Sequence, residues 1–454
     1  MTGIELPRAG SRWSSVATSA LGGLLGGLAG AVFVVVVTLV IKATMDFVSS
    51  QVTWVLIVVP LLGLTSGVLV LQRYGQSEDE KNFVPVATGP RAGSPRRHSW
   101  RIFQPRGVQA DITGDVVDSA GEEERFPWRQ TPVRTVAIFA TVGLGAAMGT
   151  EAPAAYFGVA AGACLGDRGR WWRRLLRPAA LGGGAAGVAA LMGIPLVGTA
   201  YMLELGRRHH APLSADRITA ALIGGLVGWG INVAFGLNLI RLIVPKEPPR
   251  NFPQAVITAL FIGAISGLIT SLAGAAIYGA KKWQASPGVR LALGGLATAV
   301  TAVALAIIAT PSAAVGPGGG AILWAENTNA LPLSLLAVAL LRGVATTAAV
   351  AAGGCGGIFV PFLAVGDLAG RVFAPGLGVG NDLAGSAGAA GGIAGGYRLP
   401  LTAAAMVLGL GGPHLAKLTC LATVAIAFLT AAGAASVLDR SKRLVQFRRQ
   451  ARTH

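Results

Sequence analysis

Hydrophobic residues along this chain fall into long runs separated by short polar or basic stretches. The runs lie near residues 18–42, 52–72, 133–148, 154–166, 179–205, 217–245, 253–279, 289–309, 331–352, 357–373, 384–410 and 415–438. A simple spanning helix needs about 20 apolar residues, but several runs are longer or shorter, and many contain glycine or proline. Such pieces predict helices that stop partway through a membrane, where the backbone must be buried in protein or line a cavity. We therefore expect an all-α polytopic membrane protein built of broken, tilted helices.

Composition supports a surface that faces lipid. Of 454 residues, 53% are hydrophobic and only 13% are charged, whereas a soluble domain carries about 25% charged residues. The net charge of +17 is concentrated between the apolar runs, in clusters at 73–106, 167–177 and 440–452. Basic clusters of this kind are typical of cytoplasmic loops and favour anionic lipid headgroups as partners. Their placement argues against nucleic acid as a partner.

The pattern also predicts how the chain is divided and oriented. The first apolar run is too long for the core of a signal peptide. Arg8 and Arg12 precede it, whereas the loop after it carries no basic residue, so we expect a cytoplasmic N-terminus. The expected location is the cell membrane, with both termini cytoplasmic. The expected parts are a cytoplasmic N-terminus (1–15), a transmembrane domain (16–438) with halves of about 16–210 and 211–438 and a partly disordered cytoplasmic insert (73–132), and a basic cytoplasmic tail (439–454).

Residues that could bind a metal or perform covalent chemistry are few. Cys164, Cys355 and Cys420 lie in apolar or glycine-rich surroundings and suggest neither a disulfide framework nor a zinc site. No His-Glu-x-x-His motif is present, and no nucleophile–base pair appears at membrane depth. We therefore predict no metal, no cofactor and no catalytic residue, and an integral-membrane enzyme is the least favoured class.

The chain contains an internal repeat. AGVAALMGIPLVGTAYMLEL (186–205) aligns without a gap on GGIAGGYRLPLTAAAMVLGL (391–410), and seven positions are identical. Upstream of each copy lies a break made of glycine and proline: GTEAP (149–153) and GIFVP (357–361). Paired breaks in the two halves are the expected sign of a transporter built from repeats, and they point to its binding site.

The breaks are suited to binding an anion. A helix that begins inside the membrane presents free N–H groups and the positive end of its dipole, and an anion can satisfy both. Glycine allows close approach to the backbone, and proline in the first turn has no N–H to leave unpaired. The alternative is a pair of kinked helices that pack against their neighbours and bind nothing.

Glu151 strengthens the functional interpretation. It is the only charged residue between Phe139 and Leu165, and it lies at the first break. An ionisable residue inside the membrane is a functional candidate by default. When ionised, its carboxylate could occupy the position of the anion; when protonated or displaced, it would vacate that position. The alternative is a carboxylate that caps a helix and has no gating role.

Two of these segments resemble a known family. GGIFVPFLAVGDLAG (356–370) is similar to the glycine-x-Phe-x-Pro signature of the CLC family of chloride channels and proton-coupled chloride exchangers. GTEAP resembles the family's Gly-Arg-Glu-Gly-Pro motif, which carries the gating glutamate, and the two repeat segments resemble those that follow each motif. The resemblance covers roughly residues 16–438 and is that of a divergent prokaryotic-type member without CBS domains.

The resemblance implies two inverted-topology repeats and a homodimer with one anion pathway in each subunit. It makes Glu151 the external gating residue. It also implies that the backbone around the two breaks binds the anion, at Gly149, Thr150, Ala152, Gly357, Ile358, Phe359, Val360 and Pro361.

Several positions depart from the family pattern. The first anion motif, Gly-Ser-Gly-Ile-Pro, has only PRGVQ (105–109) as its counterpart, which makes Arg106 and Gly107 weaker anion-binding candidates. The pore tyrosine is missing from the last apolar run, and its position falls near Ser436.

The proton pathway of the family's exchangers is altered as well. The proton-relay glutamate falls on Leu205. The adjacent Glu204 is either structural, which we favour, or a substitute residue on a proton pathway. Thr150 and Ala152 replace the arginine and glycine that flank the gating glutamate in the family.

Three functions follow. The leading hypothesis is a chloride channel or passive chloride transporter gated by Glu151. The second is a proton-coupled antiporter for chloride or another small anion such as fluoride. The third is a homologue that transports nothing and serves as a membrane scaffold.

Overall fold

The computed structural model describes residues 9–74, 126, 128–166, 175–208, 213–237, 248–411 and 417–450, and these form helices joined by short loops. The helices of the first half are α1 (Ala9–Ser49), α2 (Thr53–Tyr74), η2 (Trp128–Gln130), α4 (Thr131–Ile138), η3 (Phe139–Gly143), α5 (Glu151–Gly166), α6 (Leu176–Met192) and α7 (Pro195–Arg208). Helix α8 (Ala215–Ala234) lies past residue 210 but is grouped with them because it packs on α6 and α1. Those of the second half are α9 (Phe252–Lys282), α10 (Pro287–Ile308), α11 (Pro311–Ala314), α12 (Gly319–Asn327), α13 (Pro332–Ala352), α14 (Phe359–Arg371), α15 (Ala374–Leu377), α16 (Asn381–Gly392), η5 (Ile393–Tyr397), α17 (Pro400–Gly411) and α18 (Leu418–Gln450).

Seven helices within the described ranges are long and apolar enough to cross a membrane: α1, α2, α8, α9, α10, α13 and α18. Large apolar side chains project outward from them. Val36, Leu272 and Leu296, for example, are 56%, 59% and 63% exposed. Exposed apolar surface on this scale is stable against lipid and not against water. The all-α, multi-pass fold predicted from the sequence is confirmed.

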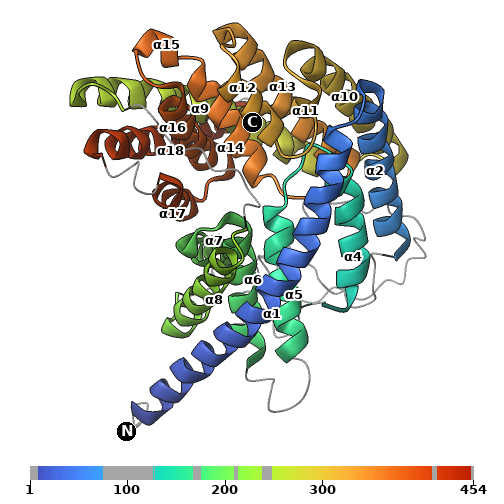
Figure 1. The fold of residues 1–454 in the computed structure, drawn as a ribbon, viewed down its shortest axis with the longest axis vertical. Helices are drawn as coiled ribbons and strands as arrows, with labels where there is room; N and C mark the ends of the chain where they lie inside the picture. Colours follow the sequence, from blue (N-terminus) through green and yellow to red (C-terminus); the bar gives the residue numbers. More distant parts are fainter. Residues whose placement is uncertain are drawn as a thin grey trace.

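The two halves of the chain occupy different parts of the molecule. In Figure 1, helices α4 to α8 lie in the lower part, and most helices of the second half lie in the upper part. The halves meet where α7 packs on α17 and where α2 packs on α10. Pro195 begins α7 and Pro400 begins α17, so the aligned prolines of the repeat take the same structural role. Proline suits this position because the first turn of a helix lacks an acceptor for its N–H.

Equivalent close contacts recur in both halves. A Cβ on Gly158 of α5 would lie 2.1 Å from the carbonyl oxygen of Gly183 on α6. A Cβ on Gly366 of α14 would lie 2.3 Å from the carbonyl oxygen of Gly388 on α16. Small residues allow helix backbones in membranes to approach this closely. The repeat therefore extends from the sequence to the packing of its helices.

The first and last described helices reach beyond the expected bounds of the transmembrane domain (16–438). Helix α1 already begins at Ala9, and α18 runs on to Gln450, so most of the expected tail (439–454) is a continuation of the last helix. Most of the predicted insert (73–132) lies outside the described residues, and so do Arg106 and Gly107.

Candidate functional site

The loops that precede α5 and α14 are joined directly. Gly149 and Gly357 form an isolated antiparallel bridge. The N–H of Gly149 donates to the Gly357 carbonyl and the N–H of Gly357 donates to the Gly149 carbonyl, both at 2.7 Å. The two breaks identified in the sequence therefore meet, and the N-termini of α5 and α14 begin on either side of this bridge.

Both helices begin in the same way. The first bond of α14 runs from the N–H of Phe362 to the Ile358 carbonyl at 3.2 Å, and the first of α5 runs from the N–H of Ala154 to the Thr150 carbonyl at 2.8 Å. The N–H groups of the preceding residues in each turn have no acceptor within their helix. Pro153 and Pro361 lie in these first turns and bring no N–H of their own.

Glu151 lies inside this junction. Its side chain is fully buried. A Cβ added to Gly149 would lie 2.2 Å from Glu151 Oε2, and one added to Gly357 would lie 2.8 Å from the same oxygen. Only glycine leaves room for the carboxylate at these two positions. The glycines of the two breaks therefore admit an anionic group to the space between the loops.

The surroundings of this carboxylate are unusual for a buried acid. Neither oxygen has a hydrogen-bond partner among the residues that the structure describes. Backbone N–H groups of Glu151, Val360 and Thr150 lie close enough to favour its charged form, but none completes a hydrogen bond with it. A buried carboxylate without a partner is costly, and the positive ends of two helix dipoles offset part of that cost. The junction thus places the positive ends of two helices around one buried acid.

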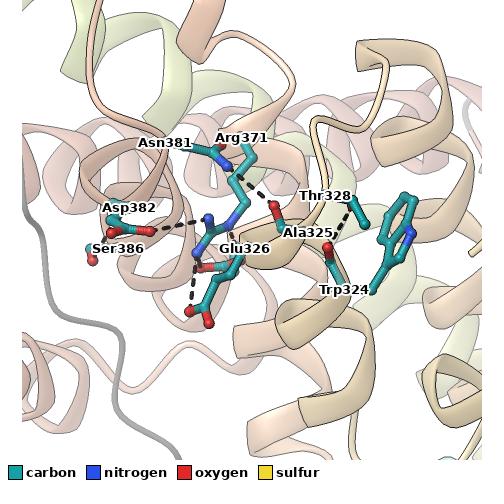
Figure 2. Close-up of polar contacts among 9 residues, drawn as sticks. Trp324, Ala325, Glu326, Thr328, Arg371, Asn381, Asp382 and Ser386 are labelled. Carbon is teal, nitrogen blue, oxygen red and sulfur yellow. Dashed lines mark hydrogen bonds and ion pairs between the residues drawn. The ribbon is translucent and has the colours of Figure 1, made fainter. Parts of the chain in front are cut away.

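The far end of α14 is held by a buried ion cluster, which Figure 2 shows. Arg371 Nε donates to Asp367 Oδ1 at 2.7 Å, and both side chains are fully buried. The same guanidinium lies 3.5 Å from Asp382 Oδ1 on α16 and 3.6 Å from Glu326 Oε1 on α12. Asn381 adds a bond from Nδ2 to the Ala325 carbonyl at 3.2 Å. These contacts tie α12, α14 and α16 together and fix the direction in which α14 points.

Aromatic rings surround the first residue of α14. The ring of Phe359 meets the ring of Tyr397 edge-on at 5.4 Å and that of Tyr201 at 6.3 Å. The hydroxyls of Tyr201 and Tyr397 are 3.2 Å apart and hydrogen-bonded. The sequence analysis did not single out either tyrosine. The available signal was that each one lies inside a copy of the repeat.

Glu204 is engaged at the start of α17. Its carboxylate accepts from the N–H of Leu401 at 2.6 Å and, at 2.8 and 2.6 Å, from the N–H and the hydroxyl of Thr402. This geometry is that of a side chain that caps another helix, and it supports the structural interpretation of Glu204. Leu205 beside it is buried.

Ser436, the remaining candidate among the described residues, is not part of the junction. Ser436 is exposed on α18, and its hydroxyl donates to the Ala432 carbonyl of the same helix at 2.8 Å. The predicted anion-binding residues of the two breaks, by contrast, lie next to one another across the bridge of Gly149 and Gly357.

The described residues thus define a multi-pass membrane protein in which two helix starts converge on one buried acid. Residues 103–432 match the family described as voltage gated chloride channel. The chain belongs to this family.

Relatives and solved structures agree with that assignment. Voltage-gated ClC-type chloride channel ClcB of Escherichia coli O9:H4 (strain HS) is 24% identical over 288 residues, which cover 62% of this chain and 65% of the relative. The chain thus spans slightly less than two thirds of the curated relatives it matches.

The fold is also that of solved CLC structures. A CLC-type fluoride/proton antiporter has a TM-score of 0.66 at 19% identity, covering 94% of this chain and 98% of the other. A slow cyanobacterial Cl⁻/H⁺ antiporter has a TM-score of 0.63 at 18% identity, covering 93% and 94%.

Proposed function

We propose that this protein moves a small anion, chloride, across the cell membrane and that Glu151 is its gate. One observation carries the proposal: a fully buried carboxylate occupies the junction of two helix N-termini, and its oxygens have no hydrogen-bond partner among the described residues. Helix N-termini favour anions, so the carboxylate holds the position that a transported anion would take. The proposal includes a homodimer with one pathway per subunit and both termini in the cytoplasm.

The gate works by competition. While Glu151 is ionised, its carboxylate fills the space against Gly149 and Gly357 and repels an incoming anion. Protonation removes the charge, so the side chain no longer competes for the helix N-termini. An anion can then be stabilised by the backbone N–H groups at Phe359 and Val360 and those after Glu151. Selectivity comes from fixed dipoles that replace the hydration shell of the ion.

Reconstituted liposomes with an imposed chloride gradient test this function. The wild type is expected to release chloride, and Glu151→Gln, which imitates the protonated acid, is expected to release it faster. Asp216→Asn on α8 is a matched control because Asp216 accepts from Ser15 far along the chain from the junction. Unchanged flux in both Glu151→Gln and Glu151→Ala would contradict the gating role. Absence of flux for chloride, fluoride and nitrate in the wild type would favour a scaffold function.

Proton coupling is the second candidate, and it is favoured by the two solved antiporters that share this fold. The position expected for an internal proton acceptor is Leu205, and the carboxylate of Glu204 is bonded to Leu401 and Thr402. A leucine at the acceptor position and a carboxylate already engaged in hydrogen bonds leave no evident internal proton acceptor at these two positions, so they favour passive transport over proton coupling. Simultaneous recording of pH and anion flux separates the two, because an exchanger moves protons in fixed proportion to the anion and loses that movement in Glu151→Ala.

A further inference from the structure

We propose that Arg290 on α10 is a positioning residue for the anion site: its guanidinium holds the end of α13 and thereby sets where the backbone N–H groups at the start of α14 lie. The inference rests on the proposed function, in which those N–H groups stabilise the transported anion. Arg290 lies outside both breaks of the sequence. It acts through the backbone that it holds in place and does not bind the anion itself.

Arg290 is a buried cation whose hydrogen bonds within the described part of the chain all go to backbone carbonyls. Its side chain is 1% exposed. Nε donates to the Ala351 carbonyl at 2.9 Å, and Nη2 donates to the carbonyls of Val350 at 3.3 Å and Ala280 at 3.5 Å. Val350 and Ala351 belong to the last turn of α13, and Ala280 belongs to the last turn of α9. One guanidinium thus lies at the C-termini of two helices, where the helix dipole favours positive charge.

The last carbonyls of α13 are shared between a glycine turn and this arginine. The final four carbonyls of a helix have no N–H partner within it. Gly353 has φ of 95°, and its N–H donates to the Val350 carbonyl at 3.1 Å. The N–H of Gly354 donates to the Ala349 carbonyl at 3.0 Å. This Schellman turn leaves the Ala351 carbonyl to the arginine, so the two devices together fix the end of α13.

Gly294, one turn further along α10, brings the two helices into backbone contact at the same place. A Cβ on Gly294 would lie 2.4 Å from the backbone nitrogen of Ala352 and 2.8 Å from the carbonyl oxygen of Ala348. Small residues allow helices in membranes to approach this closely. Arg290 and Gly294 therefore hold the same end of α13, one through hydrogen bonds and the other through close contact.

The last turn of α13 leads directly into the second break. Only residues 353–358 separate α13 from α14. Within them, the N–H of Cys355 donates to Thr141 Oγ1 at 3.3 Å, and Gly357 forms the bridge with Gly149. Because the segment is short and held at both ends, a shift at the end of α13 displaces the bridge and the N–H groups beyond it. A binding site depends on the residues that support its geometry in this way.

Arg290→Met tests the inference, because methionine keeps an unbranched apolar side chain and loses every donor. Chloride binding to the purified protein is measured by titration calorimetry, and chloride release from liposomes is measured over a series of chloride concentrations. A hydrogen bond to a charged group corresponds to roughly a tenfold change or more in binding. If the N–H groups of α14 move out of line, we therefore expect chloride binding to weaken about tenfold and the half-saturating chloride concentration to rise in proportion.

Two further variants separate positioning from simple stabilisation. Arg290→Lys keeps a positive charge at the two helix ends but replaces the planar fork by a single ammonium. It is expected to recover thermal stability relative to Arg290→Met and to leave chloride binding weaker than in the wild type. Gly294→Ala keeps the arginine but places a Cβ against Ala352, and it is expected to weaken chloride binding as well. Both variants carry the test if Arg290→Met does not fold.

Each substitution has a matched control nearby. Gly288→Ala on α10, where a Cβ meets nothing within 4 Å, is the control for Gly294→Ala. Lys282→Met is the control for the loss of positive charge, because Lys282 belongs to the last turn of α9 and its ammonium lies over the Tyr278 ring at 4.2 Å. Both controls are expected to bind chloride as the wild type does.

The outcomes keep this inference apart from the proposed function. Unchanged chloride binding in folded Arg290→Met or Gly294→Ala, with or without a loss of thermal stability, would overturn the positioning role. Wild-type binding in Arg290→Lys, or an equal loss in Lys282→Met, would reduce Arg290 to a source of positive charge. In all of these cases faster chloride release by Glu151→Gln would leave the gate intact. A wild type that neither binds nor releases chloride would overturn the proposed function itself.

Discussion

Gly149 and Gly357 exchange two backbone hydrogen bonds of 2.7 Å and so hold the two halves of the chain together at the point where α5 and α14 begin. Both residues must lack a side chain, because the carboxylate of Glu151 fills the space that a Cβ on either one would need. One contact thus fixes both the meeting of the helix N-termini and the position of the proposed gate.

Gly357→Ala is expected to displace the gate. Its Cβ would lie 2.8 Å from Glu151 Oε2, so the carboxylate must move out of the junction. The variant should resemble Glu151→Gln, with faster chloride release from liposomes. Gly433→Ala on α18 is the control, because a Cβ there meets no atom within 4 Å. Slow, wild-type release from folded Gly357→Ala would show that the carboxylate does not obstruct the pathway.

Chloride flux through the wild type is expected to rise as the pH is lowered. Protonation neutralises Glu151, so the anion no longer competes with a fixed negative charge. In Glu151→Gln the dependence should disappear, because the amide carries no charge at any pH. Chloride flux from liposomes, recorded over a series of pH values, measures the pH dependence of the wild type and of Glu151→Gln. A pH response that persists in Glu151→Gln would assign the titrating group elsewhere.

Arg371→Met is expected to lower the stability of the folded protein strongly. The substitution leaves the buried Asp367 without the guanidinium that lies 2.7 Å away, and an uncompensated buried charge costs about 3–5 kcal/mol. Thermal unfolding in detergent measures the loss. The double variant Arg371→Met/Asp367→Leu should recover part of it, since no charge is then left stranded on α14. A double variant less stable than the single one would contradict this account.

Gly158→Val and Gly366→Val are expected to impair folding to a similar extent. Each places a β-branched side chain where the next helix backbone lies 2.1 or 2.3 Å from the Cβ position, and the helix pairs α5–α6 and α14–α16 are repeat equivalents. The yield of monodisperse protein in size-exclusion chromatography reports the effect. Gly230→Val on α8, where a Cβ meets nothing within 4 Å, should retain its yield. Tolerance of valine at one site alone would show that the two pairs do not share their packing.

Much of the site was predictable because its signals are local. The helix starts at Glu151 and Phe359 follow from glycine and proline within a few residues, and the lone charge of Glu151 stands out in an apolar run. The tyrosine pair was not predictable, because nothing near Tyr201 in the sequence indicates that Tyr397 will be its neighbour. Ser436 illustrates the opposite case: a position matched along the chain is exposed on α18 and bonded to its own helix.

The residue pattern alone shows that the chain lies in a membrane, that its helices are broken at two related places, and that one break carries an acid. These properties depend on residue composition and on backbone preferences within a turn or two. The folded chain adds that the breaks touch, that the acid is enclosed between them, and that Tyr201 meets Tyr397 beside Phe359. Those relations join residues about 200 positions apart, and they arise from the close packing of glycine-lined helices, a property of the whole fold.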